Sequence, residues 1–491
     1  MKKRSLLYSC VVLSSVLVVC VVMSSCGREF YVDARTLPPS GVLNRVMIAQ
    51  QNPNALPFVD AYYDIRHAYD ASSGSFSIAG YSGNGPLSIE NLPEQQIGAV
   101  YAEGDGSLAL INYAGEKLST TISVPGGLSS SVEGSPYNGI MVTRDLNYIY
   151  AANPINYVVS VVDRTTGVSE VLDLPNAYGI SVNPGGTVAL IFIRNATQVP
   201  GYAVRAENPA SFAVYSFVKL TSAQQLLAIN NPNWNGAQDC EPQKLPTWCI
   251  FPVSTGSSAS FDHPIKAVFS ADGTTAYVLN CGPECGGTTA SLTTIPITAS
   301  SLNPGGYGAS GLALVAQNNI AIPGGATDAI FSGNTLYVAG QQYQPSSGLF
   351  AGTLTVVNTP ADTIAGTYSI SDGTHNRMDF GDDNTLWIGS SGCDRGVRYQ
   401  QAQTGAQVEY GCLTMFNTST NKPTVGSYLG DATGIAAVTG LGKVYTAEGG
   451  QIYIFSTTDM SELNNTNVTV TGTALDVAYM DATTDSDNTI Y

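Results

Sequence analysis

Residues 139–153 read GIMVTRDLNYIYAAN, and residues 158–167 read VVSVVDRTTG. β-Branched and aromatic residues, which suit strands, stand on either side of the turn residues Asp145 and Asn147. A short loop then separates the two stretches. The segment therefore predicts a strand, a turn, a second strand, a loop and a third strand.

The same order of segments returns along the chain, which is the signature of a repeat architecture. Three copies read AVFSADGTTAYVLN from Ala267, AIFSGNTLYVAG from Ala329 and MDFGDDNTLWIG from Met378. Looser copies begin near Gly179 and Gly434. The chain is therefore expected to contain one repeated unit rather than several unrelated domains.

These repeats resemble the YVTN-type β-propeller repeat, in which a strand ends in a Tyr-Val-Thr-Asn-like string and the chain continues into Val-Ser-Val-Ile-Asp. The resemblance covers nearly the whole mature chain. Residues 269–287, FSADGTTAYVLNCGPECGG, are also similar to a stretch of acidobacterial secreted propeller lipoproteins of unassigned function. The resemblance implies an all-β fold, a single β-propeller, and says almost nothing about activity.

The repeats predict eight four-stranded blades. Their innermost strands are expected to start near Leu87, Gly139, Gly179, Lys266, Asp328, Arg377, Gly434 and Asp476. The last of these has no partner strands after it, whereas residues 44–49 and 58–61 have no inner strand before them. Pairing the two ends in one blade would close the ring and protect both edges. Seven blades is the alternative, because the copy over residues 87–125 is degenerate.

Composition agrees with an all-β exported protein and excludes one class of partner. The 491 residues include 51 Gly, and only 12% are charged. The chain carries 20 Lys and Arg against 37 Asp and Glu, a formal net charge of -17. Because phosphate binding depends on clustered Lys and Arg, we expect no nucleic-acid partner.

The N-terminus predicts export and lipidation. Three basic residues at positions 2–4 precede an apolar run over residues 6–23, as in an export signal. Residues 23–26, Met-Ser-Ser-Cys, resemble the lipobox of bacterial lipoproteins, which predicts a signal peptide over 1–25, a palmitate-bearing Cys26 with a tether over 26–41, and a propeller over 42–491. An uncleaved transmembrane anchor is the alternative. Gly27 favours the outer membrane, with the protein facing the periplasm or the cell surface.

Six cysteines remain outside the signal region, an even number that suits an oxidising compartment. Local disulfides are the economical prediction. The pairs are Cys240 with Cys249, Cys281 with Cys285, and Cys393 with Cys412. A zinc site at Cys281 and Cys285 is the alternative, but no His lies nearby in the sequence, so we expect neither a metal nor a cofactor.

Long insertions are predicted to gather on one face of the ring. Extra length follows the second strand of four blades, after Arg194, Asn280, Gly340 and Gly389, and a longer segment over residues 221–262 precedes an inner strand. This pattern favours a binding scaffold that holds an envelope protein or a glycan, with Trp234 and Trp248 as stacking anchors. Idle insertions and burial of both Trp side chains are the alternatives.

A second candidate site lies where the inner strands begin, at the mouth of the central channel. The residues expected there are Lys266, Asp328, His375, Asn376, Arg377 and Asp476. They could line a polar pocket or form ion pairs that close the ring.

Signals for catalysis are weak. The chain has no nucleophile elbow, phosphate-binding Gly loop or His-Glu zinc motif. Some YVTN-like propellers resemble lactonases that use His, Arg and acidic residues at the channel mouth, and His375, Arg377 and Asp328 could imitate that set. The sequence therefore favours a non-catalytic envelope lipoprotein, with a periplasmic lactonase-like hydrolase as the alternative.

Overall fold

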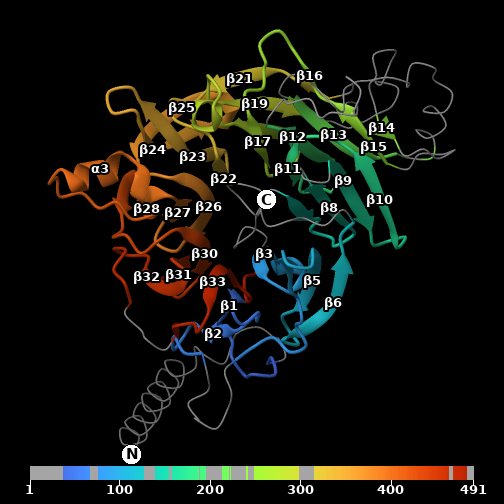
Figure 1. The fold of residues 1–491 in the computed structure, drawn as a ribbon, viewed down its shortest axis with the longest axis vertical. Helices are drawn as coiled ribbons and strands as arrows, with labels where there is room; N and C mark the ends of the chain where they lie inside the picture. The colour runs from blue at the N-terminus through green and yellow to red at the C-terminus, as the bar shows by residue number, and fades with distance from the viewer. Residues whose placement is uncertain are drawn as a thin grey trace, which may run out of the picture.

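The computed structural model describes residues 37–66, 76–125, 139–153, 157–186, 188–194, 213–220, 222, 239–240, 248–297, 314–463 and 468–483. Within these residues the strands form eight antiparallel blades around a common axis (Figure 1). The predicted all-β propeller is confirmed, and the count is eight rather than seven. Each blade is named below by its inner strand.

Five blades have four strands each, and their strands follow one another from the axis outward. These strands are β3 (Pro86–Leu92), β4 (Ile97–Ala102), β5 (Ser107–Asn112) and β6 (Lys117–Ser123); β7 (Ile140–Val142), β8 (Tyr148–Asn153), β9 (Val158–Asp163) and β10 (Val168–Asp173); β17 (Pro264–Phe269), β18 (Thr275–Asn280), β19 (Ser291–Pro296) and β21 (Asn318–Ala321); β22 (Asp328–Ser332), β23 (Thr335–Gln344), β24 (Leu349–Asn358) and β25 (Thr363–Ser369); and β26 (Thr374–Gly381), β27 (Thr385–Ser391), β28 (Leu413–Asn417) and β29 (Lys422–Val425). Their inner strands start within a few residues of the predicted positions.

Two further blades depart from this pattern. One runs β11 (Ala177–Val182), β12 (Ala189–Ile193), β13 (Ala213–Lys219), β15 (Trp248–Pro252) and β14 (Asp239–Cys240), and the other runs β30 (Ala432–Val438), β31 (Lys443–Glu448) and β32 (Gln451–Ser456). A short parallel pair, β16 (Ser254–Thr255) with β20 (Val315–Ala316), joins the β11 and β17 blades.

The two ends of the chain share the eighth blade. β33 (Thr473–Tyr479) is its inner strand and pairs with β1 (Arg45–Gln51), which pairs in turn with β2 (Phe58–Asp60). The buried Arg45 side chain fixes this closure, because its guanidinium contacts Asp481 at 2.6 Å and Glu116 at 3.0 Å. The ring closure predicted from the sequence is therefore confirmed.

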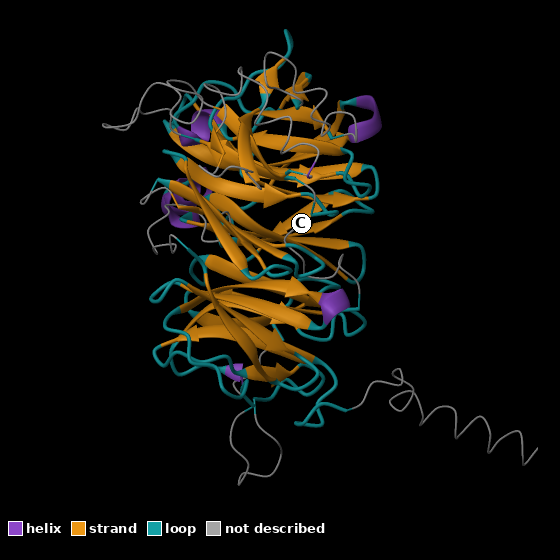
Figure 2. Cartoon of the chain, turned by 90° about the vertical axis from the view of Figure 1, so that its right-hand side faces the viewer, coloured by secondary structure: helices purple, strands orange, loops and turns teal. Residues whose placement is uncertain are grey.

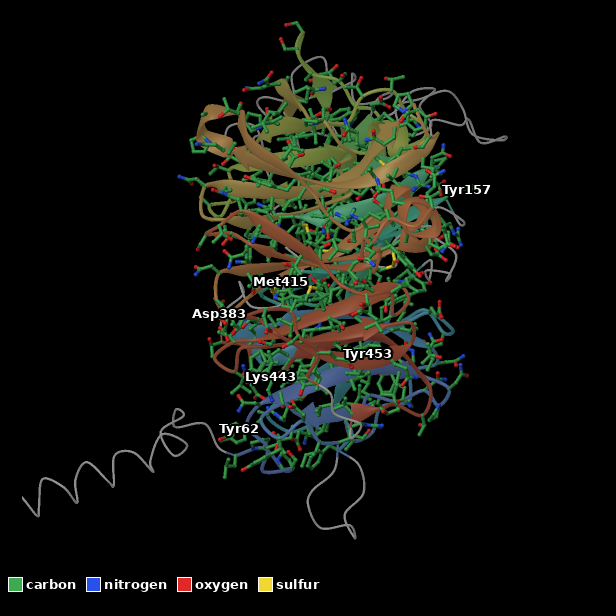
Figure 3. The ribbon with its side chains drawn as sticks, turned by 90° about the vertical axis from the view of Figure 1, so that its left-hand side faces the viewer. Tyr62, Tyr157, Asp383, Met415, Lys443 and Tyr453 are labelled. Carbon is green, nitrogen blue, oxygen red and sulfur yellow. A yellow bond between two sulfur atoms is a disulfide. The ribbon has the colours of Figure 1, made fainter. Side chains whose placement is uncertain are left out.

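The strands cross the thickness of the ring, so the connections gather on its two faces (Figure 2). Connections from the second to the third strand, and those leading into each inner strand, lie on one side, which we call the looped face. Figure 3 shows this division, since Tyr157 before β9 and Asp383 after β26 lie at opposite edges of the molecule.

Three of the predicted insertions lie on the looped face as expected. Residues 281–290 form a short connection with a 3-10 turn, η3 (Gly282–Cys285). The insertion after Gly340 is an outward extension of the β23–β24 hairpin, and the insertion after Gly389 contains η6 (Cys393–Arg395) and helix α3 (Val397–Gln403). The insertion after Arg194 lies outside the described residues.

The prediction for residues 221–262 is wrong in one respect. β15 lies within this segment and pairs with β13 as an outer strand. The part before Trp248 therefore stands between a third and a fourth strand in the sequence and does not precede an inner strand, and only residues 253–263 lead into β17. Most of that part lies outside the described residues. The sequence reasoning missed this strand because its Trp, Cys and Pro residues do not follow the repeat pattern.

Two further parts of the sequence prediction fall outside the described residues. The export signal and Cys26 are one, and Trp234 is the other. Among the described residues, no helix combines the length and the apolar character that crossing a membrane requires.

Candidate functional site

Six inner strands begin with a β-bulge at the same place on the looped face, counted over the described residues. The unpaired residues are Leu87, Tyr178, Ile265, Asn376, Thr433 and Leu475. In five of the six strands the residue after the bulge is the one that the sequence aligned at the channel mouth, as with Lys266, Arg377 and Asp476. A bulge redirects the local side chains, and here it does so at equivalent positions around the ring.

The charged side chains at the channel mouth form two ion pairs between blades. Lys266 Nζ lies 2.5 Å from Asp328 Oδ1, which joins the β17 and β22 blades. Arg377 Nη2 lies 3.0 Å from Asp476 Oδ2, and this pair joins the β26 blade to the β33 blade. Each of the four side chains is at most 14% exposed. The structure therefore brings the predicted charges together and pairs them with one another.

The Arg377–Asp476 pair passes over the β30 blade, which lies between its two partners in the ring. Gly434 makes this possible, because a Cβ atom there would lie 2.8 Å from both Cα and Oδ1 of Asp476. Asp476 Oδ2 also accepts a hydrogen bond from the Ile89 backbone N–H at 2.7 Å. Burial raises the pKa of Asp476, against the opposing effect of Arg377.

His375 lies in the wall of the ring rather than on its surface. Its side chain is 1% exposed, and Nε2 donates to the Ser371 carbonyl oxygen at 3.0 Å. Burial lowers the pKa of His375 to about 4, so the ring is neutral at pH 7. Nδ1 of His375 and Oδ1 of Asn376 are buried with no hydrogen-bond partner among the described residues.

Trp248 is not a surface anchor. It is 1% exposed, and its indole packs edge-on against Tyr148, Tyr150 and Phe217, with centroid distances of 5.4 to 5.8 Å. It therefore belongs to the apolar core between the β7 and β11 blades. The expectation that it binds a ligand is corrected in favour of burial.

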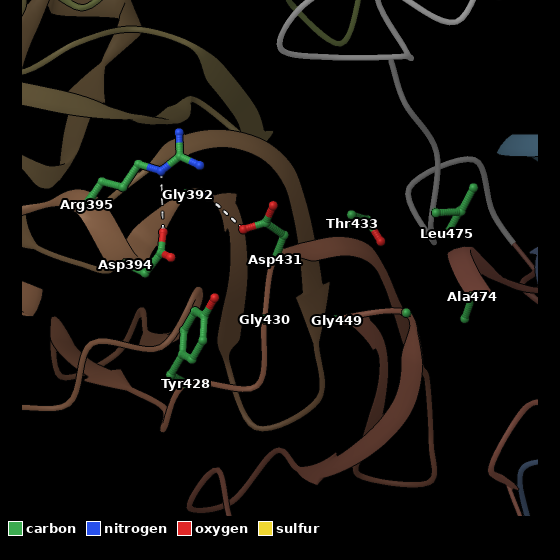
Figure 4. Close-up of a pocket in the computed structure, with 11 residues that line it drawn as sticks. Gly392, Asp394, Arg395, Tyr428, Gly430, Asp431, Thr433, Gly449, Ala474 and Leu475 are labelled. Carbon is green, nitrogen blue, oxygen red and sulfur yellow. Dashed lines mark hydrogen bonds and ion pairs between the residues drawn. The ribbon is translucent and has the colours of Figure 1, made fainter. Parts of the chain in front are cut away.

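A cavity opens on the looped face beside the channel mouth, where the β26, β30 and β33 blades meet (Figure 4). It has a volume of about 440 Å³. The polar and aromatic side chains that line it are Asp394, Arg395, Tyr428, Asp431 and Thr433. The connection between β31 and β32 is only Gly449-Gly450, whereas the β26 blade carries the long insertion between β27 and β28. The looped face is therefore lower at the β30 blade than at the β26 blade.

Glycines form the floor of this cavity because the backbone segments lie close together. A Cβ atom at Gly430 would lie 2.5 Å from Gly449 Cα, and one at Gly449 would lie 2.3 Å from the Leu429 carbonyl oxygen. Gly449 also has a φ of 55°, which favours glycine. These residues leave main-chain atoms rather than side chains facing the cavity.

One wall of the cavity is fixed by covalent and hydrogen bonds. The Cys393–Cys412 disulfide closes the base of the insertion that carries Asp394 and Arg395. The Gly392 N–H donates to Asp431 Oδ1 at 2.7 Å, which ties this insertion to the start of β30 (Figure 4). Arg395 itself is 86% exposed and lies 3.7 Å from Asp394, a surface contact that leaves its guanidinium accessible.

Three tyrosines form a ladder beside this wall. Tyr399 of α3 meets Tyr410 edge-on at 5.4 Å, and Tyr410 stacks on Tyr428 at 5.5 Å with 22° between the ring planes. Tyr428 is 41% exposed and lines the cavity. Its pKa is raised by burial and then by Asp394 and Asp431, so the phenol stays neutral at physiological pH.

A second disulfide supports the looped face two blades away. The Cys281–Cys285 bond encloses Glu284, which accepts hydrogen bonds at 2.9 Å from both the backbone N–H and Nε2 of Gln341. Gln341 Oε1 in turn accepts from the Gly373 N–H at 2.9 Å. This chain of bonds joins the β17, β22 and β26 blades.

The predicted local cysteine pairs fit the structure. Two of the three disulfides are present as predicted, Cys281–Cys285 and Cys393–Cys412. Cys249 is disulfide-bonded, and Cys240 lies directly opposite it in the β14–β15 pair. Within the described residues no group of three His, Cys, Asp or Glu side chains is arranged to hold a metal ion.

The sequence reasoning missed the cavity. Most of its residues come from three connections that lie outside the repeat pattern, and the others come from the starts of β30 and β33. Alignment of the repeats therefore gave no signal for Tyr428, Asp431 or Arg395. The available signals were the long insertion closed by Cys393 and Cys412, and the glycine pair 449–450 in the next blade.

Comparison with known proteins gives the fold and no family. No family model and no curated protein matches the chain. Among solved structures, dihydro-heme d1 dehydrogenase NirN in complex with DHE has a TM-score of 0.50 and 10% identity, over 91% of this chain and 77% of that one. Apo AztD from Citrobacter koseri has a TM-score of 0.42 and 12% identity, over 89% and 97%. A putative 6-phosphogluconolactonase from Bacteroides uniformis has 0.42 and 11%, over 89% and 99%. At these identities the likeness extends to the propeller fold alone.

Proposed function

We propose that this propeller is a non-catalytic binding scaffold of the cell envelope, which holds a protein or glycan partner on its looped face. The observation that carries the proposal is the cavity of about 440 Å³ between the β26, β30 and β33 blades. It combines an exposed aromatic ring with accessible charged groups and main-chain atoms on a braced wall. A preorganised surface of this kind loses little conformational entropy when a partner binds.

The proposal places the scaffold at the outer membrane. In this arrangement residues 1–25 are removed, Cys26 carries the lipid, and residues 26–41 tether a propeller that begins at residue 42. The multiply acylated cysteine of a lipoprotein provides stable anchoring, which a single acyl chain does not. The repeat pattern and residues 269–287 support a relationship to YVTN-type propellers and to the acidobacterial lipoproteins that the sequence resembles.

The hydrolase alternative has less support from the channel mouth. A lactonase-like site would need His375 and Arg377 to reach a substrate, but His375 is 1% exposed and Arg377 is 3.0 Å from Asp476. Asp328, the third member of that set, is paired with Lys266. Arg377 and Asp328 are held in buried ion pairs that join blades of the ring. We therefore propose that the cavity, and not the channel mouth, is the binding site.

Blocking one face at a time tests the proposal. Gln401→Cys in α3 lies on the looped face and Ser419→Cys lies in the turn between β28 and β29 on the opposite face, and both native residues are exposed in the same blade. The full chain in detergent would be labelled at either position with a polyethylene-glycol maleimide and used to capture components of an envelope extract. We expect the label at Gln401→Cys to abolish capture, and the label at Ser419→Cys to leave it intact. Equal capture by both labelled proteins would overturn the proposal.

The lipid tether has a separate test. Cells that express the full chain or Cys26→Ala would be fed radioactive palmitate. The full chain should incorporate the label and Cys26→Ala should not. Incorporation by Cys26→Ala would show that the tether is wrongly assigned.

A further inference from the structure

We infer that the cavity between the β26, β30 and β33 blades binds a neutral saccharide, with Tyr428 as the stacking platform. This inference rests on the proposed function, since it names the class of ligand that the looped face takes. It chooses glycan over protein, and the experiment below separates its failure from that of the scaffold itself.

The size of the cavity suits a small ligand. Its volume of about 440 Å³ lies within the range of roughly 300–1,000 Å³ that is usual for ligand pockets. The channel mouth, in contrast, is occupied by its own ion pairs. Within the described part of this face, the cavity is therefore a place where accessible polar groups and free volume coincide.

Tyr428 supplies the apolar part of the recognition. Sugar rings present a face of C–H groups surrounded by hydroxyls, and an aromatic ring with a polar tip matches both. Tyr410 covers one face of the Tyr428 ring, with 22° between the planes, and Tyr399 contacts Tyr410 edge-on. Tyr428 remains 41% exposed, so it is a supported ring with surface left for a ligand.

The charged groups around Tyr428 favour hydroxyls over anions or cations. Asp394 and Asp431 can accept hydrogen bonds from ligand hydroxyls, and Arg395 can donate to their oxygens. Two carboxylates against one guanidinium repel phosphate or carboxylate ligands. The presence of Arg395 among the acids opposes a cationic ligand, so a neutral polyol fits the mixed set best.

Backbone groups also contribute to the proposed recognition of a saccharide. Asp431 is held by the Gly392 N–H at 2.7 Å, so its carboxylate has a fixed orientation before a ligand arrives. Gly449 and Gly450 line the cavity without side chains, which leaves room for a ligand to lie close to the backbone. Fixed polar groups of this kind give orientation and specificity within a pocket.

The test is a titration of the full chain with defined sugars. The chain would be kept in a polyoxyethylene detergent, because detergents with sugar headgroups would compete. The probes are disaccharides of glucose, galactose, mannose and N-acetylglucosamine in α and β linkage, followed by isothermal titration calorimetry and ligand-detected NMR. We expect at least one of them to bind, with an affinity that hardly changes with salt because the ligand is neutral.

Variants locate the binding. Tyr428→Ala should weaken it at least about tenfold, whereas Tyr428→Phe, which keeps the ring, should change it little. Tyr343→Ala is the matched control, because Tyr343 is 46% exposed on the β23–β24 hairpin of the same face and does not line the cavity. Equal weakening by Tyr343→Ala would overturn the assignment of the site.

The remaining outcomes separate the two proposals. If no sugar binds, or if binding survives Tyr428→Ala, the saccharide inference is wrong. The scaffold proposal then still stands if the label at Gln401→Cys abolishes envelope capture. If captured material is a protein whose binding falls steeply with salt, the ligand is a basic protein, and the saccharide inference fails while the looped face keeps its role.

Discussion

The absence of a Cβ atom at Gly434 allows an ion pair to form across the inner strand of the β30 blade. Arg377 and Asp476 belong to blades that are not neighbours, and the strand between them contributes Gly434 at the crossing point. Removing or displacing one member of a buried ion pair strongly destabilises the folded protein. The energetic importance of Gly434 therefore comes from the pair that passes over it rather than from any contact of its own.

We predict that Gly434→Ala destabilises the protein by about 1–3 kcal/mol, the usual range for overpacking. The new methyl carbon would lie 2.8 Å from Asp476 Cα and from the Val477 nitrogen, backbone atoms that cannot move without disturbing β33. Urea-induced unfolding followed by circular dichroism measures the change. Gly115→Ala is the control, because the atoms nearest its Cβ are side-chain atoms 3.3 Å away. Equal stability of the two variants would contradict this account.

Glu448 gives a prediction for pH. Its side chain is 1% exposed, Oε1 accepts from Thr446 Oγ1 at 2.8 Å, and Oε2 has no hydrogen-bond partner among the described residues. Burial raises its pKa from 4.5 to about 7. The folded protein thus binds the Glu448 proton more tightly than the unfolded chain does. The stabilising contribution of the protonated carboxyl is therefore fully present below pH 4.5 and is lost as the pH rises to about 7.

Glu448→Gln should remove that dependence. Between pH 4.5 and 7 the variant should gain up to about 3 kcal/mol of unfolding free energy relative to the wild type, since each pKa unit is worth about 1.4 kcal/mol. Urea unfolding at several pH values measures the difference. Glu94→Gln, at an exposed position, is the control. A constant difference between Glu448→Gln and the wild type across this range would refute the prediction.

At the scale of single residues, the sequence predicted which charged side chains lie at the channel mouth, but it did not predict that they form ion pairs with one another. The repeats aligned Lys266, Arg377 and Asp476 correctly because the bulge before each one recurs in the same place. Their pairing depends on distances across the ring, and Arg377 and Asp476 are 99 positions apart. No local pattern carries that information, so ion pairs and an open pocket could not be distinguished.

At the scale of strands and loops, the insertion over residues 392–412 is the element that most shapes the looped face. Its disulfide, Cys393–Cys412, has both cysteines fully buried beside Ala432. Helix α3 within it is also held by Arg398, whose backbone N–H donates to Asp372 at 2.6 Å. The insertion is thus anchored at its base and along its length.

Cys393→Ala with Cys412→Ala should lower the free energy of unfolding by about 2–4 kcal/mol, as for other disulfides that close loops of this length. It should also speed tryptic cleavage after Arg395 and Arg398, because the base of the insertion is no longer fixed. Limited proteolysis with mass spectrometry measures the cleavage. Removing Cys281 and Cys285 is the control and should leave these two cleavage rates unchanged. Unchanged cleavage in the first variant would show that the disulfide does not brace this wall.

Strands were predictable where they follow the repeat and not elsewhere. β18, β23 and β27 share an aromatic residue after turn residues, so their positions were found from the sequence. β15 reads Trp-Cys-Ile-Phe-Pro and lies after a long insertion, which hid its role as an outer strand. The cavity was hidden for the same reason, since most of its lining comes from connections of unrelated sequence.

For the whole molecule, stability depends on the pairing of the first and last strands. β1 pairs with β33 from Val46 opposite Tyr479 to Gln51 opposite Thr473. Without β33, apolar residues of β1 and of the β30 and β3 blades that are now buried would be exposed to solvent. An open ring of this kind also exposes unpaired strand edges, which promote aggregation.

Truncation tests this dependence. A chain that ends at Gly472 should fail to form a monomer and should aggregate, whereas a chain that ends at Thr483 keeps β33 and Asp481 and should fold like the full protein. Size-exclusion chromatography and circular dichroism in detergent distinguish the two results. A folded monomer of the shorter chain would mean that the ring does not need its last strand.

The shared blade also imposes an order in time. During synthesis β1 leaves the ribosome among the first strands, but its partner β33 follows more than 400 residues later, as the register of Val46 with Tyr479 requires. At a typical elongation rate of about 5–20 residues per second, β1 waits on the order of tens of seconds with one edge unpaired. The ring closes only after almost the whole chain has emerged, so the edge of β1 that pairs with β33 stays open until the end of synthesis.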